Sequence, residues 1–212
     1  MTQLFLSAAL TFLVIIDPIG NVPIFMGVTQ GRTDAERRVI AIRANSVAAV
    51  TLVIFGVAGN YILEFLGITL AALRIAGGIL LLLLAIDMVL ARQSGLRSTT
   101  EPEDREAEHK DDVAVFPLAI PLIAGPGAMT SVLILVGQAG HDILGIVVVI
   151  GVMLGVLLIT LLSFFSASWL MARLGVTGVN VVGRVLGIVL AALAIQNIVD
   201  GLAKTFPGLL HN

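Results

Sequence analysis

Hydrophobic residues fill long continuous runs in this chain, and polar residues collect in the stretches between the runs. Each of six runs is close to the roughly 20 residues that a helix needs to span a bilayer. None shows the alternation, in segments of roughly ten residues, that is typical of a membrane β-barrel. The pattern therefore predicts six transmembrane helices, at about residues 4–28, 38–64, 70–90, 115–136, 143–170 and 182–202.

The composition indicates an all-α integral membrane protein with one membrane domain, residues 1–212. Hydrophobic residues make up 58% of the chain, charged residues 12%, and the mean hydropathy is +1.07. No polar stretch is long enough to form a second core. The net charge of −2 argues against a nucleic-acid partner, and the absence of cysteine excludes disulfides and thiolate–metal sites. We expect no metal site and no cofactor.

The polar linker at residues 91–114 holds seven of the fourteen acidic residues, and its composition predicts a flexible connector. Most of the basic residues in the predicted loops lie on the same side of the membrane as this linker. Because loops rich in arginine and lysine stay in the cytoplasm, this side is predicted to be cytoplasmic, with both termini outside. The residues concerned are Arg32, Arg37, Arg38, Arg92, Arg97, Arg105, Lys110 and Arg173.

Two of the six runs are interrupted, by Asp17-Pro18-Ile19-Gly20-Asn21 and by Gly125-Pro126-Gly127. Proline breaks the hydrogen-bond ladder of a helix, and a carboxylate at the bilayer centre costs about 3 kcal/mol. Such backbone is tolerated only where it is buried in protein or lines a water-filled cavity. We therefore expect helices 1 and 4 to be broken at the midplane, with Asp17 and Gly125 as N-caps of the second half-helices.

The two interruptions correspond in an internal repeat. At a shift of 108 residues Pro18 falls on Pro126, and Leu66-Gly67 falls on Leu174-Gly175. Each copy contains three helices, an odd number, so successive copies enter the membrane from opposite sides. This predicts an inverted repeat of about residues 1–90 and 115–202, an architecture of secondary transporters that bind substrate near the midplane.

The chemistry of the interruptions predicts a site for a zwitterion such as an α-amino acid. Half-helix N-termini bind carboxylates, whereas Asp17 and the unwound carbonyls suit an ammonium group or a cation. Asp17 is also the predicted site of a coupling ion, a proton or sodium. The predicted substrate-binding residues are Asp17, Pro18, Gly20, Asn21, Gly125, Pro126, Gly127, Ala128, Met129, Thr130 and Ser131.

Structural roles compete with this interpretation. Asp17 can serve only as a cap, Thr130 and Ser131 can bond within their own helix, and the glycines can serve close packing. For the remaining polar positions we favour interfacial anchoring or pairing between repeats over substrate contact. These positions are Arg43, Asn45, Arg74, Asp87, Arg184, Asn197 and Asp200.

The segments DPIGNVPIF and PLAIPLIAGPGAMTSV, with six runs and a charged central loop, resemble the MarC family over essentially the whole chain. These are bacterial and archaeal inner-membrane proteins, grouped with neutral amino acid transporters and distantly related to LysE-type exporters. The resemblance implies an inner-membrane location and small neutral amino acids as substrates. Its DPIGN motif falls on Asp17 to Asn21 and its GPGA motif on Gly125 to Ala128.

Two other functions stay open. The protein could export other small metabolites or drugs, or act as a membrane scaffold without transport, and an oligomer is possible in each case. An enzyme is not expected, because P-loop, HExxH and GxSxG motifs are absent and only Asp17 is a central titratable group.

Overall fold

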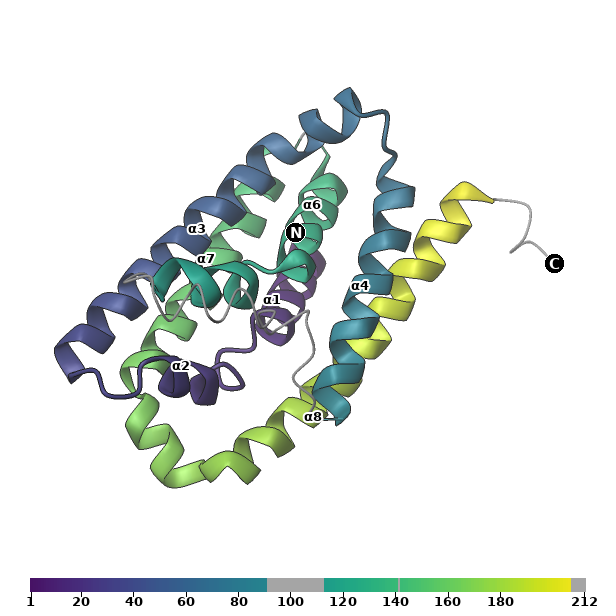
Figure 1. Ribbon diagram of the computed structural model, residues 1–212. Coiled ribbons are helices and arrows are strands. Elements are labelled where there is room, and N and C mark those ends of the chain that lie inside the picture. Colours follow the sequence, from purple (N-terminus) through teal and green to yellow (C-terminus); the bar gives the residue numbers. More distant parts are fainter. Residues whose placement is uncertain (91–112, 141, 207–212) are drawn as a thin grey trace.

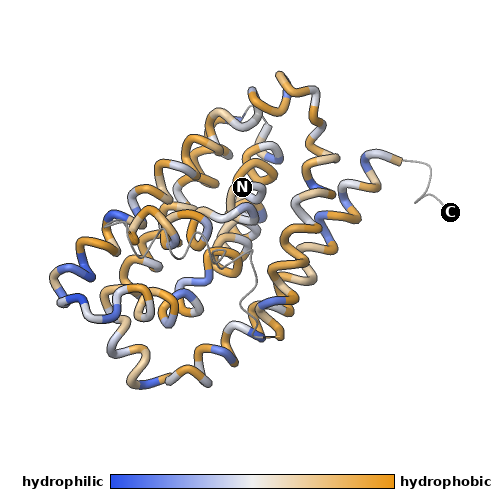
Figure 2. The backbone as a smooth tube through the Cα atoms, in the orientation of Figure 1, coloured by the Kyte–Doolittle hydropathy of each residue, from blue (hydrophilic) through white to orange (hydrophobic). Residues whose placement is uncertain are grey.

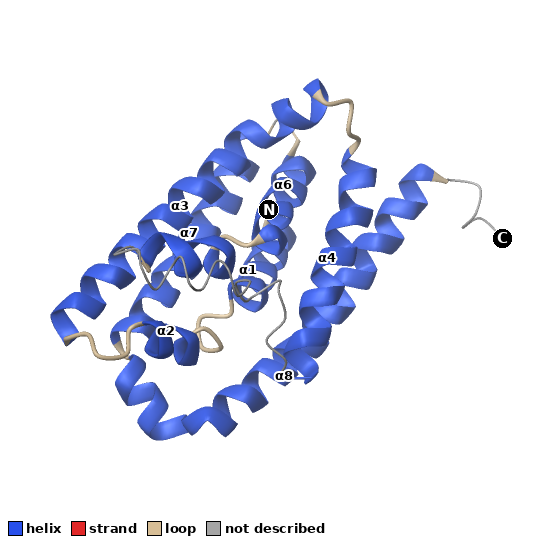
Figure 3. Cartoon of the chain, in the orientation of Figure 1, coloured by secondary structure: helices blue, strands red, loops and turns tan. Residues whose placement is uncertain are grey.

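The computed structural model describes residues 1–90, 113–140 and 142–206 (Figure 1). Within these ranges the secondary structure is helical throughout, with no strand (Figure 3). The elements are α1 (Thr2–Ile16), α2 (Val22–Val28), α3 (Asp34–Phe65), α4 (Leu70–Leu90), η1 (Ala114–Ile123), α6 (Pro126–Ala139), α7 (Ile143–Phe165) and α8 (Ala167–Thr205). Almost all of the predicted linker, residues 91–114, lies outside the described residues.

Four helices in the described part of the chain, α3, α4, α7 and α8, are long and apolar enough to cross a membrane. The bent pair η1 and α6, with 53° between its halves, makes a fifth. α1 has 15 residues, fewer than the roughly 20 that a span requires. The described part of the chain is thus all-helical, with four or five candidate membrane spans where the sequence predicted six. Figure 2 shows hydrophobic residues along these helices.

The break between the last two predicted helices is present but shorter than expected. We expected non-helical backbone after residue 170 and a new helix at 182, whereas α8 begins at Ala167 and runs to Thr205. The stretch contains no proline, and its one residue with a non-helical backbone is Gly175 (φ 62°, ψ 177°), where two helical segments meet at a kink. Gly67, which the repeat aligns with Gly175, also has a positive φ (69°) and follows the end of α3. Glycine adopts this conformation without a steric cost.

α3 begins four residues before its predicted start because Thr33 and Glu36 form a capping box. The Thr33 hydroxyl oxygen accepts from the Glu36 N–H at 3.3 Å, and the Glu36 carboxylate accepts from the Thr33 N–H at 2.8 Å. Together these bonds satisfy two backbone donors at the helix start.

α4 and α8 form a close antiparallel pair, which lies side by side along most of its length in Figure 1. Three glycines allow the approach. A Cβ at Gly78 would lie 2.8 Å from the carbonyl oxygen of Ala194, and one at Gly201 would lie 2.8 Å from that of Ala71. A Cβ at Gly187 would likewise lie 3.1 Å from a carbonyl oxygen of α4. Small residues are what let helix backbones meet inside a membrane, where no hydrophobic force joins them.

The short helices at the interruptions pack against the long ones. α1 contacts α7, and η1 contacts α3. α2 contacts α8, and α6 contacts α4. The residues that flank both interruptions, among them Ile16, Val22, Ala124 and Ala128, belong to the buried core. The broken backbone therefore lies against protein rather than on the lipid-facing surface.

We predict that Gly78→Ala lowers the midpoint of thermal unfolding of the purified protein in detergent. The added methyl group collides with the α8 backbone, and overpacking of this kind costs about 1–3 kcal/mol. Gly183→Ala is the matched control, because nothing lies within 4 Å of a Cβ there and alanine favours the helix. Equal stability of the two variants would contradict the close α4–α8 contact.

Candidate functional site

The first interruption begins where α1 ends, at Asp17. This residue has a left-handed backbone (φ 48°, ψ 68°), a conformation that aspartate and asparagine tolerate better than most residues. Its Oδ1 accepts from the Gly20 N–H at 3.0 Å, and its carbonyl oxygen accepts from the Asn21 N–H at 3.1 Å. A Cβ at Gly20 would collide with the Asp17 carboxylate, so a larger residue there would require the carboxylate to move.

The second half-helix does not start at Pro18, as we had predicted. α2 begins at Val22 with Asn21 as its N-cap, and Asp17 is the C-cap of α1. The reason is the second proline. Pro23 has no N–H and is suited only to the first turn of a helix, which places the helix start at Val22.

Asn21 joins the two halves of the first interruption. Its Nδ2 donates to the carbonyl oxygen of Ile16 at 2.6 Å, which supplies a partner at the end of α1. The side chain is fully buried, and its Oδ1 has no hydrogen-bond partner within the described residues. Asp17 is 1% exposed. The first interruption thus places a carboxyl group and an unpaired acceptor in the protein interior.

The second interruption has the predicted form. Gly125 is extended and is the N-cap of α6, and Pro126 occupies the first turn. A Cβ at Gly125 would collide with the carbonyl oxygen of Pro121, so no other residue fits. The preceding segment η1 is irregular because Phe116 and Ile120 each precede a proline and have extended backbones.

The two hydroxyl side chains after the second interruption, Thr130 and Ser131, differ in their hydrogen bonding. Thr130 Oγ1 donates to the Pro126 carbonyl oxygen at 2.8 Å, which is the structural alternative considered above. Ser131 is 2% exposed, and its Oγ has no partner in the part of the chain that the structure describes. Ser131, rather than Thr130, therefore has a hydroxyl available to a ligand.

A small cavity lies between the end of α1 and the start of α6. It has a volume of about 20 Å³, room for roughly one water molecule. Four of the predicted site residues line it: Gly125, Pro126, Gly127 and Ala128. The rest of its lining consists of Ile15, Leu80, Leu84 and residues 121–123.

This cavity is therefore not the open cavity, shared by both interruptions, that we expected, and that expectation stays a prediction. Asp17, Pro18, Gly20, Asn21, Met129, Thr130 and Ser131 do not line the cavity. Asp17 and Asn21 are bonded to the backbone of their own turn, and Ile15 fills the space beside Gly127 instead.

Asn45 of α3 carries a third unpaired acceptor. Its side chain is 6% exposed, its Nδ2 donates to the Ala41 carbonyl oxygen at 3.2 Å, and its Oδ1 lacks a partner among the described residues. We had favoured an anchoring or pairing role here. The signal in the sequence is a lone amide among alanines at helical spacing, because Ala41 and Ala48 are buried on the same face.

Arg74 and Asp200 pair with each other across the α4–α8 contact. Arg74 Nη1 lies 3.9 Å from Asp200 Oδ2, and Arg74 is 6% exposed. Gln196 also donates to Asp200, at 2.8 Å. This is the pairing role that we favoured over substrate contact for both residues. Within residues 1–90, 113–140 and 142–206, no three histidine, aspartate or glutamate side chains gather to hold a metal ion.

These features define a polytopic membrane protein with two interrupted helices in its core. The chain matches the MarC family of integral membrane proteins over residues 2–206. The protein therefore belongs to the MarC family.

Curated relatives match this chain over most of its length. A UPF0056 membrane protein of Bacillus subtilis, YvbG, is 40% identical over 91% of this chain and 91% of its own length. A UPF0056 membrane protein of Archaeoglobus fulgidus is 39% identical over 94% of this chain and 92% of its own length. YhcE of Escherichia coli, also a UPF0056 membrane protein, is 36% identical over 93% and 91%. No solved structure matches the chain.

We predict that Asn21→Ala destabilises the protein and that Ser131→Ala does not. The first change leaves the Ile16 carbonyl without its partner, at a cost of about 1–3 kcal/mol, whereas the Ser131 hydroxyl has no bond to lose. Thermal unfolding of both purified variants measures the difference. Equal losses of stability would show that Ser131 also has a structural partner.

Proposed function

We propose that the protein is a secondary transporter of small neutral amino acids in the cytoplasmic membrane, with its substrate site at the midplane. The observation that supports this most is the burial of Asn21 Oδ1, in the first interruption, and of Ser131 Oγ, after the second, without partners among the described residues. An unpaired buried polar group costs about 1–3 kcal/mol. A protein with only a structural role gains nothing from this cost, whereas a transporter recovers it when a polar substrate binds.

The substrate would bind between the two interruptions. The N-terminus of α6, after Gly125, offers backbone N–H groups to a carboxylate. Asp17 offers its charge to the ammonium group, and Asn21 and Ser131 offer hydrogen bonds. Asp17 is also the group that we propose for coupling to protons or sodium. A substrate without charged ends would use few of these groups, which favours a zwitterion over an apolar drug.

The contacts between helices support two inverted repeats. If α1, α2 and α3 correspond to η1, α6 and α7, the contact of α1 with α7 has its counterpart in that of η1 with α3. The contact of α2 with α8 likewise has its counterpart in that of α6 with α4. Such an exchange of partners is expected for two copies that face each other.

Transport would require the interior to open. The 20 Å³ cavity is too small for any amino acid, and Ile15 and Leu81 lie close to Gly127, one of the residues that line it. We propose that movement of one repeat against the other separates α1 from α6 and exposes the interruptions, with the structure described here as the closed conformation.

The proposed topology places the arginine-bearing end in the cytoplasm. Arg37 and Arg38 share a pocket with residues 164–169, and Arg32 and Arg43 share another with Ala114, where η1 begins. The start of α3 thus lies close both to the end of the predicted linker and to the α7–α8 junction. Positive charge at this end favours a cytoplasmic location.

The start of α1 and the end of α8 lie at the other end. A Cβ at Gly145 would contact Leu4 near the start of α1, and one at Gly201 would contact Ala71 near the start of α4. A Cβ at Gly137, in the last turn of α6, would contact Leu70, the first residue of α4. The end of α6 therefore lies at the same end of the protein as the start of α4. With the arginines inside, both termini are outside.

Single-cysteine labelling tests this topology, because the natural chain has no cysteine. We expect Ser168→Cys, at the arginine-bearing end, to react only after the membrane is made permeable. Thr205→Cys, near the end of α8, should react with an impermeant reagent in intact cells. Reaction of both from the same side would refute the proposed topology.

Uptake by proteoliposomes tests the function. We expect saturable entry of labelled glycine, alanine or serine, driven by a pH or sodium gradient. Asp17→Asn should abolish uptake, or its dependence on the gradient, at equal protein abundance. Asparagine tolerates the left-handed backbone and keeps an acceptor for the Gly20 N–H, so only the charge is lost.

Glu64→Gln is the matched control, because it removes one carboxylate from the exposed end of α3 and should leave uptake unchanged. Wild-type uptake in Asp17→Asn would restrict Asp17 to a structural cap. Absence of uptake in the wild-type protein, with every gradient and substrate, would favour the scaffold or an exporter of other metabolites.

A further inference from the structure

A second polar feature lies away from the interruptions, at the arginine-bearing end. It is a pocket of about 230 Å³ between the start of α3, α2 and the α7–α8 junction. Arg37 and Arg38 line one side, and Phe164, Phe165 and Trp169 line the other. We refer to it as the arginine pocket. The proposed transport site makes no use of it.

The arginine pocket is suited to an anion. Arg37 is held in place, because its Nε donates to the Thr29 carbonyl oxygen at 3.3 Å and its Nη1 lies 3.9 Å from Asp34 Oδ1. Arg38 has no hydrogen bond or ion pair to another described residue. Two guanidinium groups thus face a single carboxylate, and guanidinium binds phosphate oxygens through paired N–H donors.

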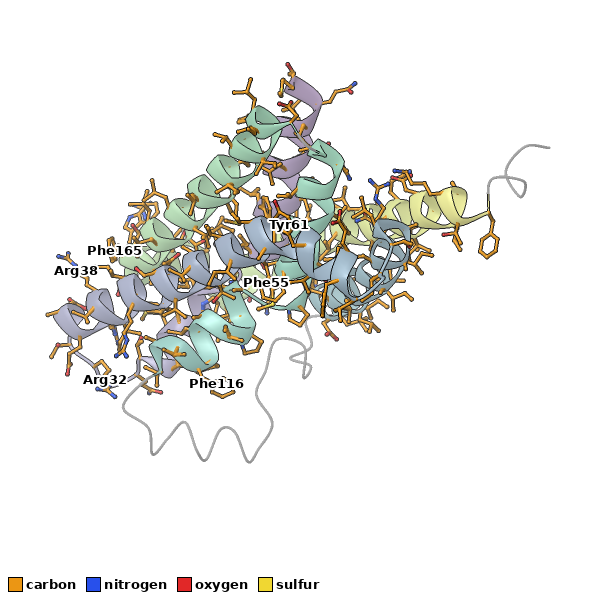
Figure 4. The ribbon with its side chains drawn as sticks, turned by 90° about the horizontal axis from the view of Figure 1, so that it is seen from above. Arg32, Arg38, Phe55, Tyr61, Phe116 and Phe165 are labelled. Carbon is orange, nitrogen blue, oxygen red and sulfur yellow. The ribbon has the colours of Figure 1, made fainter. Side chains whose placement is uncertain are left out.

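An apolar face leads to the same pocket. Leu154, Leu158, Leu162 and Phe165 follow one another along α7 at helical spacing, and their side chains are 41%, 56%, 53% and 42% exposed. Phe165 forms part of the pocket wall, and Figure 4 shows it next to Arg38. An acyl chain on this face would end with its headgroup at the two arginines.

Trp169 marks the expected depth of the headgroup. It is 61% exposed, and the Arg173 guanidinium lies 5.9 Å from its ring centre. Tryptophan is enriched at the boundary between lipid tails and headgroups. The wall of the pocket therefore carries the residue types that are typical of this boundary.

We infer that the arginine pocket binds the headgroup of an anionic phospholipid, with the phosphate at Arg37 and Arg38 and one acyl chain along the exposed face of α7. A free phosphate ion shares the chemistry of the headgroup but would make no contact with this face. The inference does not depend on the proposed transport function.

Fluorescence provides a local test, because Trp169 is the only tryptophan in the chain and lines the pocket. The full-length protein is reconstituted with phosphatidylglycerol or phosphatidylcholine that carries brominated acyl chains, which quench a neighbouring tryptophan. We expect phosphatidylglycerol to quench at lower mole fraction, with a preference of roughly fivefold for each arginine that contributes.

Arg38→Gln should reduce this preference by roughly fivefold, and Arg38→Lys, which keeps the charge, should retain most of it. Arg32→Gln is the control. It removes the same charge from the same end of the protein, but Arg32 lines the other pocket and lies on the opposite side of α3 (Figure 4). An unchanged Trp169 emission spectrum without brominated lipid shows that each variant keeps the local fold.

Three results would overturn the inference. They are equal quenching by the two lipids in the wild-type protein, equal loss of preference in Arg32→Gln and Arg38→Gln, and removal of the preference by inorganic phosphate at constant ionic strength. The last result would identify a site for the free ion, and the second would indicate only a general attraction to a negative surface.

Discussion

A lipid tail offers no hydrogen-bond partner, and this constraint determines how the two interrupted helices are held. The backbone that Pro18, Pro23 and Pro126 interrupt has to be buried in protein or supplied with other donors and acceptors. The structure does both. α3, α4, α7 and α8 surround the short helices, and the close α4–α8 pair depends on glycines that let two backbones meet. The buried interior then becomes a place where polar groups can be kept.

The two interruptions solve the same problem with different residues. At the first, side chains act: Asp17 binds the Gly20 N–H, and Asn21 binds the Ile16 carbonyl oxygen. At the second, Gly125 fits against the Pro121 carbonyl oxygen and Pro126 begins the helix without side-chain caps. The first interruption therefore contributes charge and amide groups to the interior, whereas the second contributes backbone N–H groups. This difference is what a ligand with two unlike ends would require.

α2 connects the interior to the arginine pocket. It begins at Val22, after its N-cap Asn21. One turn after the cap, Phe25 stacks on Phe164 with 4.4 Å between ring centres and 5° between planes. Both rings are almost fully buried and both line the arginine pocket. A movement of α2 would thus change the first interruption and the pocket wall together, although the two proposed ligands differ.

Local chemistry explains which features could be predicted from the residues alone. Continuous apolar runs predicted α4 with its observed bounds, proline placed the start of α6 at Pro126, and the family followed from the two motifs. Packing decided the rest. Whether Ser131 or Thr130 keeps an unpaired hydroxyl, and whether Ile15 closes the space beside Gly127, depends on which helices meet. We did not predict the start of α2 at Val22 or the helix through residues 171–174. At both places, local sequence signals for a helix and for its end compete with similar strength. Burial of a polar group is a property of neighbours distant in sequence, and only the tertiary structure brings these together.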